Sequence, residues 1–166
     1  KVGIIGCGGI AFGKHLPSLN KIKEVEMVAF CDLVEERAEK AKNEFGSQNA
    51  KVFTDYQDLL KLDLDLVHVC TPNNTHAEIS IAAMESDKHV MCEKPMAISS
   101  KEAQMMLDAM EKTNKKLTIG YQNRFRNDSQ YLYEIAQEGQ LGHIYLGKAK
   151  AIRRRAVPTW GVFLDE

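Results

Sequence analysis

Residues 2–11 read VGIIGCGGIA, so a short apolar run leads directly into the spacing G-x-G-x-x-A. A short run rich in isoleucine is typical of a strand that is buried on both faces. Gly6 permits a tight turn after this strand, Gly8 lets the backbone approach a pyrophosphate, and Ala11 lets the next helix pack closely. The spacing therefore predicts a turn that holds a dinucleotide, although glycine-rich turns also occur in ordinary loops.

A carboxylate at the end of the second apolar run supports this interpretation. Asp32 lies about 20 residues beyond the turn, where a carboxylate accepts hydrogen bonds from both ribose hydroxyls of the adenosine half. The alternative is a solvated loop aspartate that caps the next helix. Asp32 favours NAD because a carboxylate repels a 2′-phosphate, while nearby Arg37 leaves NADP open. Gly9 and Ile10 belong to the same predicted site, since the free amides at a helix start attract phosphates.

Short apolar runs alternate with longer amphipathic stretches as far as residue 120, which is the rhythm of a parallel sheet with crossover helices. We expect strands at residues 2–5, 26–31, 51–53, 66–70, 89–92 and 116–119. The predicted fold class is α/β, with a Rossmann-type doubly wound parallel sheet. The predicted dinucleotide-binding domain covers residues 1–120.

Helix signals lie between these strands. An amphipathic stretch over 35–45 is expected to end at Gly46 in a left-handed conformation. Thr75 with Glu78, and Ser99 with Glu102, have the spacing of capping boxes at helix starts. After the second box, apolar residues recur at helical spacing and are interpreted as core: Ala103, Met106, Leu107 and Met110.

The rhythm changes after residue 120. A polar, arginine-bearing segment leads to an expected helix over 129–138, stopped by Gly139, and then to an expected strand over 144–152. We interpret residues 121–166 as the incomplete start of a second α/β domain for substrate binding and oligomerisation. This boundary depends on the change of rhythm alone, because no repeat or linker marks it.

Polar residues also follow the fourth predicted strand, at the sheet edge where such folds bind ligands. Thr71, Pro72 and Asn73 come directly after it, and His76 follows at a helix start. Thr71 and Asn73 are placed to hydrogen-bond the cofactor's second ribose or a phosphate. Threonine and asparagine before a helix are also ordinary caps, and His76 can simply cover the helix start.

The fifth predicted strand ends in Glu93-Lys94-Pro95, which puts a charged pair at the same edge. A free lysine holds its proton too tightly for efficient exchange at neutral pH, but partial desolvation and a cationic nicotinamide weaken that hold. Lys94 is then suited to relay the proton of a substrate hydroxyl. The alternative is a surface ion pair of Glu93 with a neighbouring base.

Together these segments resemble the Gfo/Idh/MocA oxidoreductases, a family named for glucose-fructose oxidoreductase and inositol dehydrogenase. The resemblance rests on GCGGIA at 6–11, TPNNTH at 71–76, EKP at 93–95, GYQNRF at 120–125 and GQLG at 139–142. It covers essentially the whole chain. It implies a nucleotide-binding domain joined to an α/β substrate domain with a large open sheet, in proteins that often form homodimers or homotetramers.

The same resemblance implies roles for single residues. It makes Lys94 the catalytic residue that also contacts substrate and cofactor, and it makes Glu93 a cofactor-side residue that orients the nicotinamide. Gln122 is a candidate for the cofactor edge and Arg124 for the substrate edge. Family members are much longer, so their aspartate and histidine catalytic partners are expected beyond Glu166. If residues 1–166 are the whole molecule, we expect binding to survive and turnover to fail.

The predicted function is therefore an NAD(P)-dependent oxidoreductase that transfers a hydride between nicotinamide and a sugar, polyol or related hydroxy compound. A non-catalytic NAD(P)-binding sensor or regulatory subunit is the alternative, and it would bind without turnover. A methyltransferase using S-adenosylmethionine on the same sheet is a third class, but it gives Glu93-Lys94-Pro95 no role.

Composition restricts the partners. With 44% hydrophobic and 27% charged residues the chain falls among ordinary globular proteins, and its net charge of −1 creates no general field for nucleic acid or membranes. Alternate residues of a strand face opposite sides, so the arginine run 153–155 is expected to be split between two faces. We therefore expect a small-molecule partner, and neither nucleic acid nor a membrane.

The cysteines and the N-terminus bear on the location. No C-x-x-C pair occurs among Cys7, Cys31, Cys70 and Cys92, which predicts neither a metal site nor a disulfide framework. The chain opens on a strand-like run without an apolar leader, and no apolar run approaches the roughly 18 residues that span a bilayer. A cytoplasmic location is expected.

Overall fold

A computed structural model describes residues 1–150 and 152 of the chain. The contacts divide the chain into two compact units, one over residues 1–120 and another that begins at Tyr121. The arginine run 153–155 lies outside the described residues, as does part of the strand expected over 144–152.

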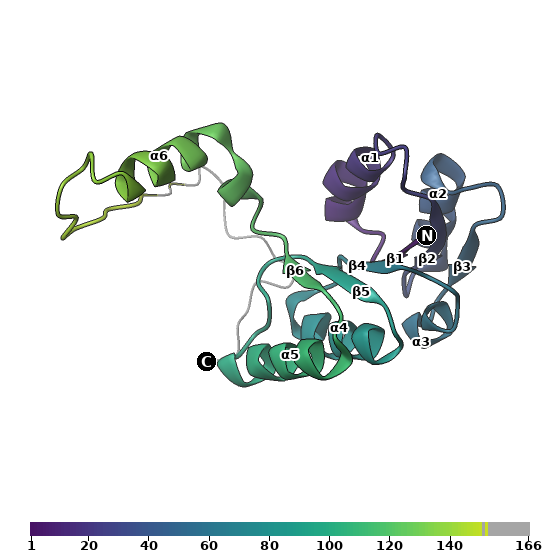
Figure 1. Ribbon diagram of the computed structural model, residues 1–166. Coiled ribbons are helices and arrows are strands. Elements are labelled where there is room, and N and C mark those ends of the chain that lie inside the picture. The colour runs from purple at the N-terminus through teal and green to yellow at the C-terminus, as the bar shows by residue number, and fades with distance from the viewer. Residues whose placement is uncertain (151, 153–166) are drawn as a thin grey trace. The chain divides into compact units, whose positions relative to one another are not determined.

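The first unit is built on a six-stranded parallel sheet in the order β3-β2-β1-β4-β5-β6 (Figure 1). Its strands are β1 (Val2–Ile5), β2 (Met27–Cys31), β3 (Lys51–Phe53), β4 (Leu66–Val69), β5 (His89–Cys92) and β6 (Leu117–Ile119). Each predicted strand is confirmed to within one residue at either end, and so is the Rossmann-type fold. The strand order reverses between β1 and β4, which is where such sheets bind ligands.

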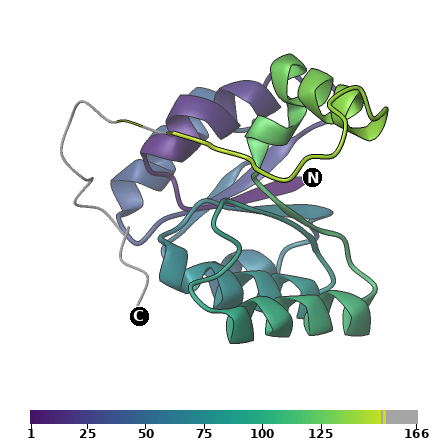
Figure 2. The ribbon, with the colours of Figure 1, turned by 90° about the vertical axis from the view of Figure 1, so that its left-hand side faces the viewer.

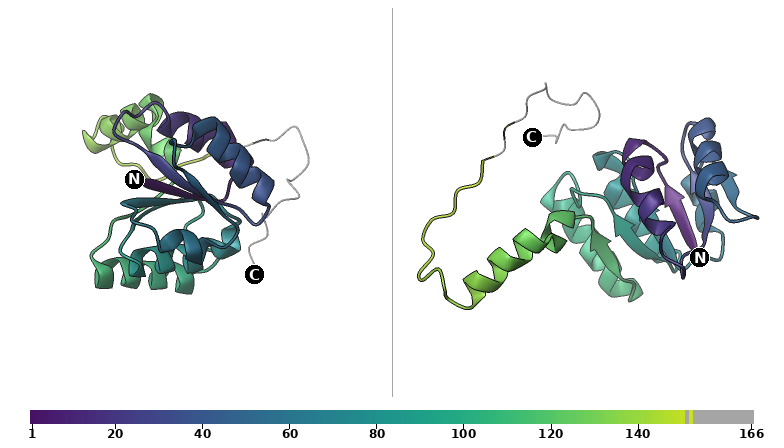
Figure 3. Two further views of the ribbon diagram at one scale, coloured as in Figure 1. Left: turned by 90° about the vertical axis from the view of Figure 1, so that its right-hand side faces the viewer. Right: turned by 90° about the horizontal axis from the view of Figure 1, so that it is seen from above.

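Helices cover both faces of this sheet (Figures 2 and 3). One face carries the π-helix η1 (Ala11–His15), α1 (Leu16–Leu19) and α2 (Glu35–Phe45). The other carries α3 (Tyr56–Leu60), α4 (His76–Glu85) and α5 (Ser100–Thr113), and the short 3₁₀ helix η2 (Asn73–Thr75) precedes α4. Helix α3 was not anticipated. Its signal is Asp55, whose carboxylate accepts a hydrogen bond from the Gln57 amide at 2.8 Å as an N-cap.

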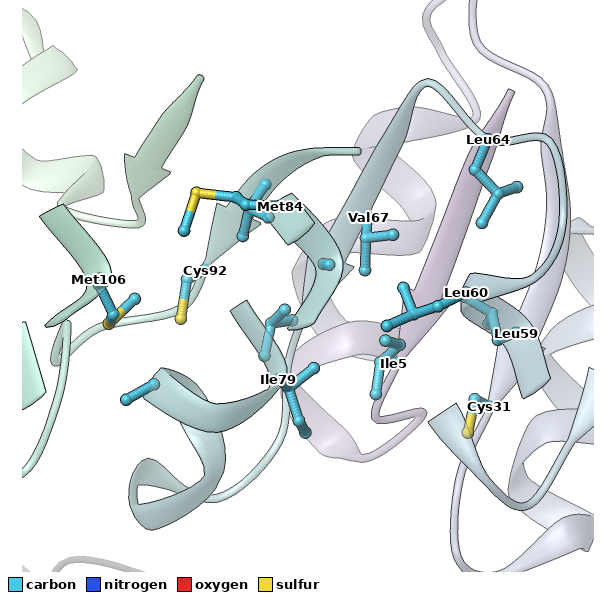
Figure 4. Packing of buried hydrophobic residues seen from close by; sticks show 14 of the residues in the cluster. Ile5, Cys31, Leu59, Leu60, Leu64, Val67, Ile79, Met84, Cys92 and Met106 are labelled. Atoms are coloured by element: carbon cyan, nitrogen blue, oxygen red, sulfur yellow. The ribbon is translucent and has the colours of Figure 1, made fainter. Parts of the chain in front are cut away.

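Alternate strand residues supply two separate cores, because successive side chains of a strand face opposite sides. Ile4 and Phe30 are fully buried on the α1–α2 side. Ile5 points to the other side, where Met106 of α5 is also fully buried (Figure 4). The core prediction was wrong for Leu107, which is 39% exposed because it lies one position around α5 from Met106.

Gly46 ends α2, but not in the way predicted. Its backbone is extended, with φ −72° and ψ 150°, so the left-handed cap was wrong. A Cβ atom at this position would lie 2.6 Å from the carbonyl oxygen of Lys42. The close approach of the chain to the last turn of the helix, rather than a positive φ, therefore favours glycine here.

The two capping boxes have different outcomes. Ser99 caps α5, since its Oγ accepts a hydrogen bond from the Glu102 amide at 3.2 Å, while the Glu102 carboxylate accepts from the Ile98 amide at 3.4 Å. The box at Thr75 was wrong, because no side-chain bond caps α4 at this residue. Glu78 instead accepts a hydrogen bond from the Tyr56 hydroxyl at 2.7 Å.

The second unit contains the 3₁₀ helix η3 (Gln122–Phe125) and helix α6 (Asn127–Gln137). Gly139 follows α6 with φ +73°, as expected of a residue that stops a helix. Residues 144–150 form no strand, so that prediction was wrong for the part of the chain that is described. A strand needs a neighbour that pairs with its backbone, and no described residue pairs with this segment.

Candidate functional site

Loops that carry the predicted site residues follow four adjacent strands of the sheet. Gly6 follows β1, Asp32 follows β2, Thr71 comes shortly after β4 and Glu93 follows β5. Because the strands are parallel and adjacent, all four loops lie at the same edge of the sheet. The first unit therefore gathers these predicted site residues on one side.

The turn after β1 requires glycine at one position and leaves open space at two others. Gly6 has φ +91°, and a Cβ atom there would lie 2.6 Å from the carbonyl carbon and oxygen of Cys70. A Cβ atom at Gly8 or Gly9 would meet nothing within 4 Å. Gly6 therefore serves the fold, whereas the bare backbone of Gly8 and Gly9 faces space that a ligand can enter.

The turn leads into η1, whose first residue, Ala11, is fully buried against the sheet, while Ile10 just before it is 43% exposed. A larger residue at position 11 would push the helix away from β1. The first amides of a helix have no partner within it, so they are available to an anion. A helix that starts directly after Gly8 in the chain is the arrangement that the G-x-G-x-x-A spacing predicted.

Asp32 is tied to the glycine turn by its side chain. One oxygen, Oδ2, accepts a hydrogen bond from the Cys7 amide at 2.8 Å, and the other, Oδ1, accepts from the Val34 amide at 2.9 Å. Arg37 Nη1 lies 3.9 Å from Oδ1, and the Asp32 side chain is 10% exposed. The carboxylate therefore supports the glycine turn and its own loop, but it is neither solvated nor a side-chain cap of α2, so the alternative interpretation is not confirmed. A carboxylate has about four acceptor positions, so further hydrogen bonds to a ligand are compatible with this role.

The loop after β4 is held by its own hydroxyls. Thr75 Oγ1 lies 2.8 Å from both Thr71 Oγ1 and the Pro72 carbonyl oxygen. The Thr75 hydroxyl has one proton, so it donates to the Pro72 carbonyl and accepts from Thr71. Its hydrogen bonds are made within this loop, and it does not cap α4. Pro72 is exposed and Asn73 is half-buried at the start of η2.

His76 is 1% exposed and joins two loops. Its Nδ1 lies 2.7 Å from the Pro95 carbonyl oxygen and its Nε2 lies 2.9 Å from the Thr71 carbonyl oxygen. The ring therefore lies between two carbonyl oxygens, one from each loop. The residue braces the loop after β4 against the loop after β5. The cofactor contact assigned to His76 stays a prediction.

Glu93 is held on both oxygens. Oε1 lies 2.6 Å from His15 Nε2, and Oε2 accepts a hydrogen bond from the Lys94 amide at 3.1 Å. Glu93 thus has a histidine as its partner, but each side chain is only 12% exposed, so this is not the surface ion pair of the alternative interpretation. Lys94 is exposed, and the peptide bond to Pro95 is cis.

Two histidines at this site escaped the sequence interpretation. His15 ends η1, and its ring meets that of His68 on β4 edge to face, with centroids 5.5 Å apart. The available signal was spacing, because His15 lies about one helical turn beyond the sheet-facing Ala11. His68 is 7% exposed, and its Nδ1 has no hydrogen-bond partner among the described residues.

The burial of His68 predicts acid sensitivity. Burial, with a smaller contribution from His15, lowers the pKa of His68 from 6.5 to about 4. In the unfolded chain His68 takes up a proton below about pH 6.5, whereas in the folded chain it stays neutral until about pH 4. Because the unfolded state binds more protons in this window, the free energy of unfolding falls by about 2 kcal/mol as the pH drops through it.

Urea unfolding at pH 7 and near pH 4.5 measures this loss. We expect His68→Phe to lose less stability over this interval than the unmodified chain. His143 is exposed, so His143→Phe is the matched control and should leave the pH dependence unchanged. An equal loss in His68→Phe and the unmodified chain would contradict the assignment.

The four cysteines are buried and free. Burial raises the pKa of Cys7, Cys31 and Cys92 to about 12 and raises that of Cys70 as well, so all four pack as neutral thiols. Among residues 1–150 and 152, no three His, Cys, Asp or Glu side chains are grouped to hold a metal ion. No helix in the same part of the chain is both long and apolar enough to cross a membrane.

Gln122 and Arg124 lie in η3 of the second unit, and both are exposed. Their assignment to the cofactor and substrate edges stays a prediction.

The chain matches the family model described as "Oxidoreductase family, NAD-binding Rossmann fold" (GFO_IDH_MocA) over residues 1–121. It is 40% identical to D-glucoside 3-dehydrogenase of Escherichia coli K12, covering 100% of this chain and 47% of that protein. It is 32% identical to inositol 2-dehydrogenase of Salmonella typhimurium LT2, covering 96% and 48%. The chain spans about half the length of the curated relatives it matches.

Solved structures show the same likeness. The WlbA dehydrogenase of Bordetella pertussis, in complex with NADH and UDP-GlcNAcA, matches with a TM-score of 0.80 and 27% identity over 87% of this chain and 43% of that one. KijD10, a 3-ketoreductase of Actinomadura kijaniata in complex with NADP, matches with a TM-score of 0.75 and 27% identity over 85% and 44%. Neighbours of this fold thus bind either nicotinamide cofactor.

Proposed function

The chain belongs to the Gfo/Idh/MocA family of oxidoreductases, and from this premise we propose that the whole protein transfers a hydride between NAD(P) and a hydroxyl-bearing carbon of a sugar or polyol. The observation that carries the proposal is the shared sheet edge. A glycine turn with open space above it, a nearly buried Asp32 and an exposed Lys94 follow β1, β2 and β5 and lie at the same edge of the sheet.

The residues of the first unit fit a dinucleotide. The bare backbone at Gly8 and Gly9 and the amides at the helix start that follows suit the pyrophosphate. Asp32 suits the adenosine ribose, and its charge favours NAD over NADP. Thr71 and Asn73 are the candidates for the second ribose or a phosphate. This assignment is supported by their position after β4, across the strand-order reversal from β2 and Asp32.

The residues of this chain position the cofactor and the substrate and hold or move the proton of the substrate hydroxyl. The bound nicotinamide supplies the hydride acceptor or donor. Lys94 holds or moves the proton of the substrate hydroxyl at its Nζ atom. Its loop is fixed on both sides, by the Glu93 carboxylate on the Lys94 amide and by His76 on the Pro95 carbonyl.

A non-catalytic sensor is not favoured, because relatives across the chain are named dehydrogenases. The methyltransferase alternative does not agree with membership of an oxidoreductase family. An assay of the complete protein distinguishes the oxidoreductase from the non-catalytic sensor. We expect one or more members of a panel of sugars and polyols to drive a change in the absorbance of reduced nicotinamide. Binding of NAD without a change for any panel member would favour the sensor.

Removal of the Asp32 carboxylate tests the cofactor assignment. We expect Asp32→Ala to weaken NAD binding by at least about tenfold, or 1.4 kcal/mol, because the ribose loses its acceptor and the Cys7 amide loses its partner. The variant should also lose its preference for NAD over NADP. Isothermal calorimetry with both cofactors measures the two effects.

Arg37→Ala is the matched control, since Arg37 is the ion partner of Asp32 and its side chain is 59% exposed. It should leave NAD affinity nearly unchanged. Unchanged affinity in Asp32→Ala would refute the ribose assignment.

We further propose a cytoplasmic protein that assembles as a homodimer or homotetramer. The support is the resemblance to a family whose members often form such assemblies. Light scattering on the complete protein measures the assembly, and a monomer at micromolar concentration would contradict it.

A further inference from the structure

A short hydrogen bond connects the glycine turn's helix to the loop that carries Lys94. His15 Nε2 lies 2.6 Å from Glu93 Oε1, and the two residues are 78 positions apart in the chain. Each side chain is 12% exposed. The helix that begins at the turn and the loop after β5 are therefore joined by a partly buried, charge-capable bond.

The geometry around this bond restricts Glu93 on several sides. Its second oxygen accepts from the Lys94 amide, so hydrogen bonds run from His15 through Glu93 to the backbone of Lys94. On another side, a Cβ atom at Gly120 would lie 3.3 Å from Glu93 Oε1, so the backbone at the end of β6 closes against the carboxylate. Glu93 is therefore held in one place.

His15 is itself supported by the sheet. The ring of His68 packs against it edge to face at 5.5 Å, and His68 is buried on β4. Burial keeps His68 neutral at neutral pH, so it contributes packing rather than a competing charge. The His15 ring is thus placed between a neutral neighbour and the Glu93 carboxylate.

We propose that His15 is a positioning residue for the nicotinamide half of the cofactor site and that it acts through Glu93. The inference rests on the proposed function, because it takes Glu93 to lie on the nicotinamide side. Without His15, a carboxylate that is 12% exposed loses its donor and turns toward water. The nicotinamide then meets a loop that is no longer preorganised, while the diphosphate turn keeps its own contacts.

Two ligands separate this role from a general structural one. NAD and ADP-ribose share the diphosphate and both riboses, and only NAD carries nicotinamide. In calorimetry on the complete protein, we expect His15→Ala to weaken NAD binding about tenfold and to change ADP-ribose binding by less than about twofold. His15→Gln should recover part of the loss, because its side-chain amide can donate to Glu93.

A double-mutant cycle tests whether His15 works through Glu93. We expect His15→Ala with Glu93→Gln to bind NAD no more weakly than Glu93→Gln alone, since the single change already removes the charged acceptor. Lys14→Ala is the matched control, because Lys14 is the exposed neighbour of His15 on the same helix. It should change neither affinity.

Three results would overturn the inference while leaving the proposed function intact. They are an equal loss of NAD and ADP-ribose affinity in His15→Ala, no loss of either, and additive effects in the double mutant. If the unmodified protein bound neither NAD nor ADP-ribose, the proposed function itself would be overturned.

Discussion

Replacing Lys94 by alanine in the complete protein is expected to lower the rate of hydride transfer by about a thousandfold and to leave NAD affinity within about threefold. General acid–base catalysis by one positioned side chain accounts for a factor of this size. Lys94 is one of several proposed cofactor contacts, and those assigned to the glycine turn and Asp32 do not involve its side chain, so most of the NAD affinity should persist.

Stopped-flow measurement of a single turnover isolates this step from product release. The substrate is the panel member that gives the largest change with the unmodified protein, and calorimetry supplies the NAD affinity. Lys101→Ala is the matched control, because Lys101 is exposed in the first turn of α5. Hydride transfer at the unmodified rate in Lys94→Ala would remove Lys94 from the mechanism.

The sheet and its binding edge were predictable because local patterns determine them. Strands buried on both faces are short apolar runs, and such runs appear at the inner strands β1, β2, β4 and β5, while the edge strands β3 and β6 are shorter and partly exposed. Gly6 was predictable for the same reason, since a strand that must turn within one residue needs a positive φ. The residues after each strand then follow from topology, because parallel strands end at a common edge.

What escaped prediction depends on contacts between distant segments. The bond from His15 to Glu93 joins positions 78 residues apart, and nothing in the spacing of either residue indicates it. Gly46 had the right identity for a left-handed cap, but the approach of the chain to Lys42 gave it another reason to be glycine. Thr75 had the right spacing for a capping box, but a nearby carbonyl and hydroxyl took its bonds.

Gly6→Ala and Gly8→Ala should separate folding from binding within one turn. We expect Gly6→Ala to lower the free energy of unfolding by about 3 kcal/mol, because its Cβ meets backbone atoms and its φ is positive. The methyl group would lie 2.6 Å from the Cys70 carbonyl carbon and oxygen. Backbone atoms cannot rotate away as a side chain can, so the turn or the end of β4 must shift.

Gly8→Ala should leave the free energy of unfolding within about 0.5 kcal/mol, because its Cβ would enter open space. That space is where the pyrophosphate is proposed to lie, so the variant should lose at least about tenfold in NAD affinity. Urea unfolding and calorimetry on both variants complete the comparison. A stable Gly6→Ala would contradict the close approach to β4, and a Gly8→Ala that binds NAD normally would place the diphosphate elsewhere. The opposite responses of two glycines two residues apart would then show that one shapes the turn and the other admits the ligand.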